Sequence, residues 1–78
     1  MWSVYILRCK DGSLYTGITT DIDRRLREHL DGKGGRYTRS FKVDSLVYSE
    51  SYVSRQDAQR REKQIKGWRR QKKNNLIR

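Results

Sequence analysis

The segment Trp-Ser-Val-Tyr-Ile-Leu-Arg-Cys at residues 2–9 decides the fold, together with Lys-Asp-Gly at 10–12 and Ser-Leu-Tyr-Thr-Gly-Ile at 13–18. The first part is rich in β-branched and aromatic residues and is apolar on both faces, which indicates a central strand. A glycine-containing turn followed by a second run of strand-forming residues predicts a β-hairpin. The first predicted unit is therefore an antiparallel pair of strands.

The length of the hairpin loop determines which side chains share a face of the sheet. A three-residue loop, with Gly12 in the left-handed region, pairs Cys9 with Ser13. A two-residue Asp-Gly loop instead places the two tyrosines of the hairpin on opposite faces, because strand side chains alternate. The three-residue loop places the following residues on one face: Tyr5, Leu7, Tyr15 and Gly17.

The segment from Thr20 to Leu30 predicts an amphipathic helix. Thr20, with Asp23 three residues later, resembles a capping box at the start of this helix. Gly32 is expected to end it. The apolar positions are spaced by four residues, at Ile22, Leu26 and Leu30.

The remaining segments predict one further strand and further helices. Ser54 with Asp57 is a second capping-box signal, and Gly67 is expected to end the helix that this signal opens. The fold class is α+β, a small three-stranded antiparallel sheet flanked by helices in the order β-β-α-β-α-α, within one domain at 1–78. The further segments are a glycine-rich loop at 31–36, a short helical turn at 37–41, a strand at 46–52, a helix at 55–66 and a last helix at 68–77.

Composition limits the classes of partner. The 78 residues include 19 Lys and Arg against 9 Asp and Glu, which gives a net charge of +10. Such a surface attracts polyanions, with nucleic acid the first candidate and anionic membrane the second. No apolar run approaches membrane-spanning length and residues 2–9 predict a strand rather than a signal peptide, so we expect no membrane partner and a cytoplasmic location. The single Cys9 fits a reducing compartment, and one cysteine with one histidine argues against structural zinc.

Glu62 breaks the pattern of the helix predicted at 55–66. It lies four residues after Ala58 and three before Ile65, so helical geometry places these three residues on one face. A carboxylate on the core side needs a partner, because burial of an unpaired charge is unfavourable. A metal ion in an open cleft would supply that partner. The alternative, which the helix pattern alone favours, is that Glu62 leans outward and pairs with Lys66.

Four other residues combine polar chemistry with positions beside the core. Arg25 and His29 lie four residues apart and flank the apolar stripe of the first helix. A guanidinium can clamp a phosphate in bidentate fashion, although the pattern alone favours an ordinary solvated face. Tyr5 and Tyr15 are either packing residues or two phenols close together over the sheet, where nearby cations would ease deprotonation.

The stretch from Lys63 to Lys73 is dense in positive charge and contains one aromatic residue. This composition suits contact with a nucleic-acid backbone, and the alternative is a solvated helix surface. The glycine-rich loop is more typical of a flexible connector than of a phosphate site. The residues expected to contact nucleic acid are Lys33, Arg36, Arg39, Lys66, Arg69, Arg70, Lys72, Lys73 and Asn74.

Taken together, these residues resemble the GIY-YIG nucleases, especially the small stand-alone, single-domain bacterial members of the UPF0213 type. The tripeptides at 3–5 and 15–17 are similar to the paired motifs of that family, with Tyr5 and Tyr15 ten residues apart. Arg25, His29 and Glu62 follow in the order that the family shows. The resemblance covers essentially the whole chain and, with turn chemistry, favours the three-residue hairpin loop. Ser3, Val4 and Thr16 depart from the family's glycine and isoleucines, at positions that mainly shape the backbone.

The resemblance implies hydrolysis of a DNA phosphodiester with one divalent metal ion, Mg²⁺ or Mn²⁺. By this resemblance Glu62 would hold the metal and Arg25 would stabilise charge on the scissile phosphate. Tyr5 and Tyr15 would position and deprotonate the attacking water, and His29 would assist as a base or proton relay. Physically, this is metal-assisted attack with electrostatic stabilisation.

The resemblance also suggests Asn74, in preference to Asn75, as the asparagine that family members carry near the end of the domain. The competing hypothesis is a non-catalytic, basic nucleic-acid-binding module with the same fold, although pure binding needs no inward carboxylate. The sequence leaves open whether the DNA is single-stranded, structured or duplex, and whether the protein is a monomer or a weak homodimer. DNA repair is one of several roles compatible with the resemblance.

Overall fold

A computed structural model describes residues 1–31 and 42–77. Its sheet has three antiparallel strands in the spatial order β2-β1-β3: β1 is Trp2–Cys9, β2 is Leu14–Thr19 and β3 is Val43–Tyr52. The order of elements is the predicted β-β-α-β-α-α, and β1 is the central strand as its two apolar faces indicated. The short turn predicted at 37–41 and the loop residues 32–36 lie outside the described residues.

The hairpin between β1 and β2 has the three-residue loop. The Cys9 amide donates to the Ser13 carbonyl at 2.8 Å, and the Gly12 amide donates to the Cys9 carbonyl at 2.9 Å. Gly12 has a φ of 90°, a conformation that favours glycine. In this register Tyr5 pairs with Gly17 across the two strands. Both hairpin tyrosines therefore lie on the same face of the sheet, as predicted.

Helix α1 is Ile22–Leu30, and its N-cap is Asp21 rather than the predicted Thr20. The Asp21 carboxylate accepts from the Arg24 amide at 3.1 Å. The cap lies one residue later than predicted because the Thr19 hydroxyl accepts from the Asp21 amide at 3.1 Å, which closes a turn around position 20. The last predicted apolar position of this helix, Leu30, is 55% exposed and does not belong to the core.

Helix α3 is Arg55–Lys66, with Ser54 as its N-cap and Gly67 as its C-cap, as predicted. The Ser54 hydroxyl accepts from the Asp57 amide at 3.1 Å. The last helix, α4, is Arg70–Ile77, and it begins two residues later than predicted. Strand β3 begins at Val43, three residues before its predicted start at Leu46, because the weak alternation there gives no sharp boundary.

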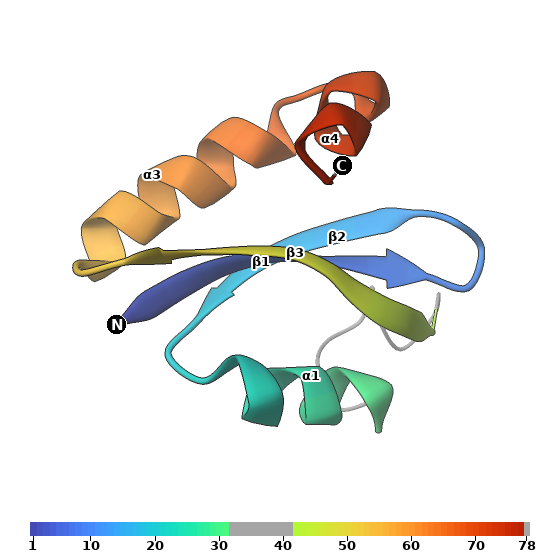
Figure 1. Cartoon of the computed structure of the whole chain (residues 1–78), viewed down its shortest axis with the longest axis horizontal. Coiled ribbons are helices and arrows are strands. Elements are labelled where there is room, and N and C mark those ends of the chain that lie inside the picture. Colours follow the sequence, from blue (N-terminus) through green and yellow to red (C-terminus); the bar gives the residue numbers. More distant parts are fainter. Residues whose placement is uncertain (32–41, 78) are drawn as a thin grey trace.

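Helices α1, α3 and α4 cover both faces of the sheet. Figure 1 shows α1 on one face and α3 with α4 on the other. The core is divided accordingly: Val4 and Ile6 pack with Ala58 and Ile65 of α3, whereas the other face has the cluster of Tyr5, Leu7 and Val43, with Leu26 of α1 packed against it. In the part of the chain that the structure describes, no helix has the length and apolarity needed to cross a membrane.

Candidate active site

Tyr5 on β1 and Gly17 on β2 form the floor of the candidate site. The Tyr5 side chain lies across Gly17, so close that a Cβ atom at position 17 would lie 2.6 Å from the Tyr5 hydroxyl oxygen and 2.8 Å from Cζ. The hairpin register produces this contact because it pairs the two residues across the strands. Glycine is therefore required at position 17 for close approach of the phenol over the edge strand.

His29 joins the Tyr5 phenol from helix α1. The Tyr5 hydroxyl lies 3.0 Å from His29 Nε2 in a buried hydrogen bond, and His29 is 1% exposed. The ring centroid of Tyr15 lies 6.3 Å from that of Tyr5 and 5.2 Å from that of His29. Two strands and one helix thus bring two phenols and an imidazole into one aromatic cluster, which the spacing of residues within each element predicted only in part.

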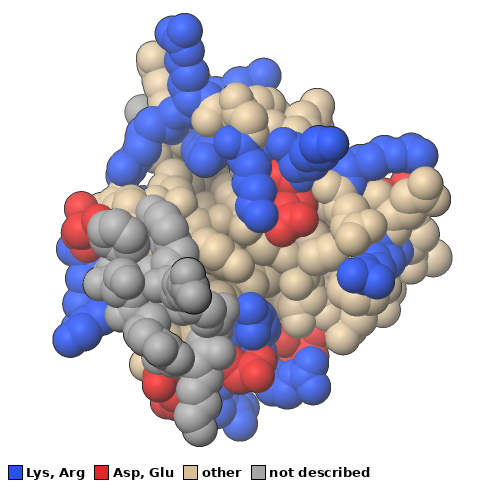
Figure 2. Space-filling view, turned by 180° about the vertical axis from the view of Figure 1, so that it is seen from behind, with Lys and Arg blue, Asp and Glu red and all other residues tan. Residues whose placement is uncertain are grey.

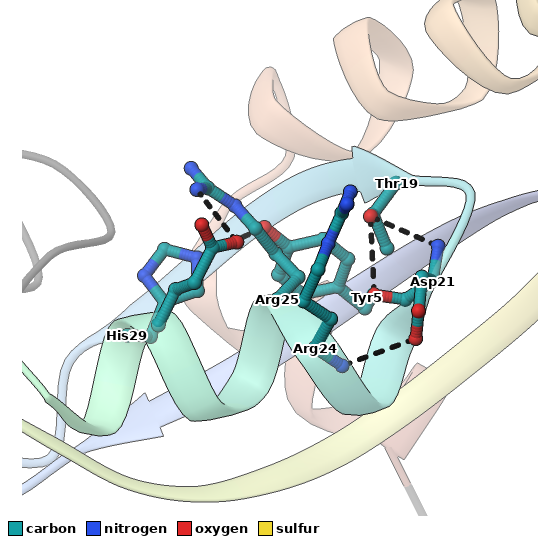
Figure 3. A network of polar contacts seen from close by, with 7 residues as sticks. Tyr5, Thr19, Asp21, Arg24, Arg25 and His29 are labelled. Carbon is teal, nitrogen blue, oxygen red and sulfur yellow. Dashed lines mark hydrogen bonds and ion pairs between the residues drawn. The ribbon is translucent and has the colours of Figure 1, made fainter.

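Arg25 lies one helical turn before His29 and faces the same phenol. Figure 3 shows Tyr5, which comes from β1, beside Arg25 and His29, which come from α1. The Arg25 guanidinium forms a hydrogen bond with Tyr5 and lies 3.6 Å from the Glu28 carboxylate. About a third of this side chain is exposed, so the guanidinium lies where the buried cluster meets solvent.

The two buried titratable groups of the cluster are both neutral at pH 7. Burial raises the pKa of Tyr5 to about 12, although the hydrogen bond from Arg25 opposes this shift. Burial, and then the positive charge of Arg25, lower the pKa of His29 below its ordinary 6.5. A neutral imidazole has an unprotonated ring nitrogen, so His29 Nε2 can accept the proton that the Tyr5 hydroxyl donates.

Glu62 approaches this cluster from helix α3, on the other face of the sheet. Successive helical residues are about 100° apart, so Arg61 and Glu62 lie on opposite flanks of the strip by which Ala58 and Ile65 contact the sheet. Arg61 reaches Glu50 of β3 at 2.6 Å, which leaves Glu62 on the β2 flank. Consistent with this placement, the negative charge of Glu62 contributes to the raised pKa of Tyr5.

The structure shows part of each hypothesis for Glu62: an ion pair with Lys66 and a side chain that is mostly buried. Its carboxylate lies 3.2 Å from the Lys66 ammonium, which is the predicted i,i+4 ion pair. Its side chain is nevertheless only 21% exposed, so it does not extend into solvent. The carboxylate is thus partly buried on the flank of α3 that faces edge strand β2, and it is accessible to a cation.

The donor set fits a hard divalent cation that keeps most of its water. Within residues 1–31 and 42–77, no group of three or more His, Cys, Asp and Glu side chains is arranged to hold a metal. Mg²⁺ is commonly bound through one or two carboxylates together with waters and substrate phosphates, so the single carboxylate of Glu62 meets that requirement. A softer metal that needs several protein ligands does not fit these residues.

Residues predicted to contact nucleic acid lie mainly on α3, α4 and the turn between them. Figure 2 shows basic side chains projecting from the upper part of the molecule, on the side of α3 and α4, with acidic atoms scattered over the same face. Lys66 pairs with Glu62, and the Arg70 guanidinium donates to the Gly12 carbonyl. Lys33, Arg36 and Arg39 lie outside the described residues. Exposed or half-exposed positions are held by Arg69, Lys72, Lys73 and Asn74.

Sequence reasoning missed a polar network between β3 and α3. The Glu50 carboxylate accepts from the hydroxyl of Tyr52 at 2.7 Å, from that of Tyr48, and from Arg61 Nε at 2.6 Å. These hydrogen bonds, after the opposing effect of burial, lower the pKa of Glu50. A signal was present, since Tyr48, Glu50 and Tyr52 alternate along one strand, but the partner from α3 lies 11 residues further on.

The fold and the cluster define a small α+β domain of a nuclease class: the chain belongs to the GIY-YIG family, and residues 1–75 match the GIY-YIG catalytic domain. It is 49% identical over 74 residues to a UPF0213 protein of Halalkalibacterium halodurans, covering 95% of this chain and 79% of that protein. A UPF0213 protein of Haloquadratum walsbyi is 49% identical over 73 residues, covering 94% and 82%. The solution NMR structure of the UPF0213 protein BH0048 from Bacillus halodurans superposes with a TM-score of 0.63 at 47% identity, covering 99% of this chain and 83% of that one.

Proposed function

We propose that this protein is a metal-dependent DNA endonuclease that hydrolyses phosphodiester bonds at a single site. The observation that carries the proposal is the buried hydrogen bond between Tyr5 and His29, beside Arg25. Core packing alone does not require a phenol, an imidazole and a guanidinium to meet beside a glycine. Perturbed titratable groups of this kind are typical of functional sites.

The Tyr5–His29 pair supplies the route for the proton in this proposal. Water attacks phosphorus, and its proton passes to the Tyr5 oxygen as the Tyr5 hydroxyl proton passes to His29 Nε2. In its resting state the Tyr5 phenol is protonated, because its pKa is raised to about 12. It can therefore accept a proton only as it gives up its own. Neutral His29 is the group that can hold the proton, and it can later return it to the leaving oxygen. Tyr15, packed beside both rings, orients the water.

In the same proposal, Arg25 stabilises negative charge on the phosphate and Glu62 binds the metal ion. The exposed donors of Arg25 stabilise the charge that develops on the phosphate oxygens in the transition state. Glu62 would hold one Mg²⁺ or Mn²⁺ ion, which when bound lowers the pKa of the attacking water and polarises the phosphate. Binding of the ion at Glu62 requires that Lys66 give way, and its 53% exposed side chain is free to do so.

The net charge of +10 supports a polyanionic substrate, and the basic residues of α3 and α4 would contact DNA around the site. One site cuts one strand per encounter, so duplex cleavage would need two successive events or a dimer. A second candidate function is nucleic-acid binding without turnover. The observation that favours it is the Lys66–Glu62 ion pair, which satisfies the carboxylate without any metal.

A cleavage assay separates these two functions. Purified protein is incubated with supercoiled plasmid and with single-stranded oligonucleotides, in Mg²⁺, in Mn²⁺ and in chelator. We expect metal-dependent cleavage that Glu62→Ala abolishes while binding survives, and Arg25→Ala lowers the rate by about 100-fold or more. Asp44→Ala is the control, because it removes an exposed carboxylate from β3. Cleavage that persists in Glu62→Ala would rule out the metal assignment.

A further inference from the structure

A groove runs along the flank of α3 that faces away from the candidate active site. It is lined by Tyr52 of β3 and by residues of α3: Asp57, Arg60, Arg61, Lys63 and Gln64. Three of these residues are cations and one is an anion. None of them belongs to the cluster of Tyr5, His29 and Glu62, because Arg61 marks the β3 flank of the helix.

A second groove lies at the α3–α4 turn. It is lined by Gly67, Trp68, Arg69, Gln71, Lys72 and Asn75. Trp68 joins the two, since the Arg61 guanidinium lies 4.9 Å and the Lys72 ammonium 4.5 Å from its ring centroid. Arg61 lines the first groove and Lys72 the second. Both grooves therefore border Trp68, and we refer to the pair together as the α3–α4 groove.

The cations of the α3–α4 groove differ in how firmly they are held. Arg61 is fixed, because it donates to Glu50 at 2.6 Å and to Gln64 at 2.8 Å and stacks on Trp68. Arg60 pairs with Asp57 at 3.7 Å while 72% exposed, a pair too solvated to hold it strongly. Among residues 1–31 and 42–77, no ion pair involves Lys63, Arg69 or Lys72. The groove thus has a rigid floor and several cations available to an anionic ligand.

The separation of this groove from the candidate active site sets the size of the ligand. Two interstrand spacings separate β2 from β3, about 10 Å, and α3 adds a diameter of about 10 Å. A ligand that engages both regions must follow a path of roughly 20 Å. At about 3.4 Å of helix axis per nucleotide of one strand, as in B-form stacking, that path corresponds to roughly six nucleotides.

We propose that the α3–α4 groove binds the phosphates of a nucleic-acid strand several nucleotides away from the bond at the candidate active site. The excess of cations over anions matches a repeating phosphate chain. The inference rests on the proposed function only for the identity of the ligand. The groove would hold the substrate by its backbone, outside the reaction and without reading sequence.

The test measures how binding depends on salt, using Glu62→Ala protein so that no strand is cut. The groove variant is Arg60→Gln with Lys63→Gln, and the control is Arg24→Gln with Arg27→Gln, which removes the same charge from exposed positions of α1. Each phosphate contact contributes about 0.7 to the slope of log affinity against log salt for a single strand, so the groove variant loses about 1.4 with a strand of about 20 nucleotides. This loss corresponds to roughly 25-fold weaker binding at 0.1 M salt relative to 1 M.

The controls distinguish the groove from general electrostatic attraction. The control variant is expected to lose less than half as much slope, and the Trp68 indole NMR signal is expected to shift on addition of the strand. An equal loss in both variants, or no loss in the groove variant, overturns the proposal, as does an equal Trp68 shift with a polyglutamate peptide. Cleavage of plasmid by wild-type protein in Mg²⁺ is scored separately, so failure of the nuclease proposal leaves the slope result interpretable.

Discussion

The Tyr5 hydroxyl and His29 Nε2 lie 3.0 Å apart, one from the central strand and one from the helix that covers it. This bond links the hairpin to α1 inside the core and satisfies a buried polar atom on each ring. It therefore serves stability and, in the proposed mechanism, proton transfer. Changes to either residue should therefore affect both properties.

Stability should fall as the pH is lowered through the range just below 6.5. The pKa of His29 is lowered in the folded state, so below the ordinary value of 6.5 the unfolded chain binds more protons than the native one. The contribution of His29 to the free energy of unfolding is therefore fully present above that value. It is lost as the pH falls toward the lower pKa of His29 in the folded state. His29 is the single histidine, so carboxylates, which titrate lower, interfere little. Denaturant melts between pH 5 and 7 provide the measurement.

The matched protein for this pH experiment is His29→Gln, which keeps a polar side chain and removes the titration. It should be less stable at pH 7 but show a flatter profile in the same window. Protonated His29 cannot accept the Tyr5 proton, so cleavage by the wild type should decline over the same range. An identical slope in wild type and His29→Gln would mean that another group controls the acid transition.

Gly17→Ala should displace the Tyr5 phenol. The added methyl group would lie 2.6 Å from the Tyr5 oxygen, so the ring must move away from position 17 on β2. We expect destabilisation of about 1–3 kcal/mol from overpacking, together with loss of cleavage. Gly67→Ala is the control, because the new Cβ there meets its nearest atom, the Gln64 carbonyl oxygen, at 3.5 Å. Thermal melts of the two variants should differ clearly, and equal melting temperatures would contradict the close contact.

The fold could be predicted where local chemistry determines it. The left-handed conformation of Gly12 and the N-cap role of Ser54 are each specified by neighbours within a few residues, and both predictions were confirmed. The first helix was more difficult, because Thr19, Thr20 and Asp21 can each cap or turn the chain. The choice of Asp21 follows from the Thr19 hydroxyl, which turns back onto the Asp21 backbone.

The candidate site was predictable within elements and ambiguous between them. Alternation placed Tyr5 and Tyr15 on one face, and helical spacing placed Arg25 with His29. The flank on which Glu62 lies could not be read from its helix, since a strip of only Ala58 and Ile65 leaves the rotation about the helix axis poorly specified. The contact of Arg61 with Glu50 on β3 settles that rotation.

The N-cap of α1 can be tested directly by substitution. Asp21→Ala removes the acceptor for the Arg24 amide and should destabilise the protein by about 1 kcal/mol. Thr20→Ala, which the sequence pattern alone would have made the damaging change, should alter stability by less than about 0.5 kcal/mol, because Thr20 is exposed and outside the helix. Urea denaturation of both variants distinguishes the two caps, and the reverse ranking would restore Thr20.

Thr16 and Thr19 offer a contrast between two buried hydroxyls on the same strand. Thr16 is 3% exposed, and its hydroxyl finds no hydrogen-bond partner among the described residues. The Thr19 hydroxyl bonds the backbone of Asp21 in both directions. Thr16→Val should therefore raise the free energy of unfolding by about 1 kcal/mol, whereas Thr19→Val should lower it by about 1 kcal/mol. A loss of stability in Thr16→Val would reveal a partner for its hydroxyl, such as an ordered water.

Lys66 should compete with a divalent ion for Glu62. Its ammonium lies 3.2 Å from the carboxylate, and a partly exposed pair of this kind contributes about 0.2–1 kcal/mol. Lys66→Gln should therefore strengthen Mn²⁺ binding by about 1.5- to 5-fold in calorimetry without DNA. Lys63→Gln removes the same charge from an exposed position of α3, and no ion pair of the described residues involves Lys63. If the two substitutions strengthened binding equally, the effect would come from net charge, and Glu62 would not be the ligand for which Lys66 competes.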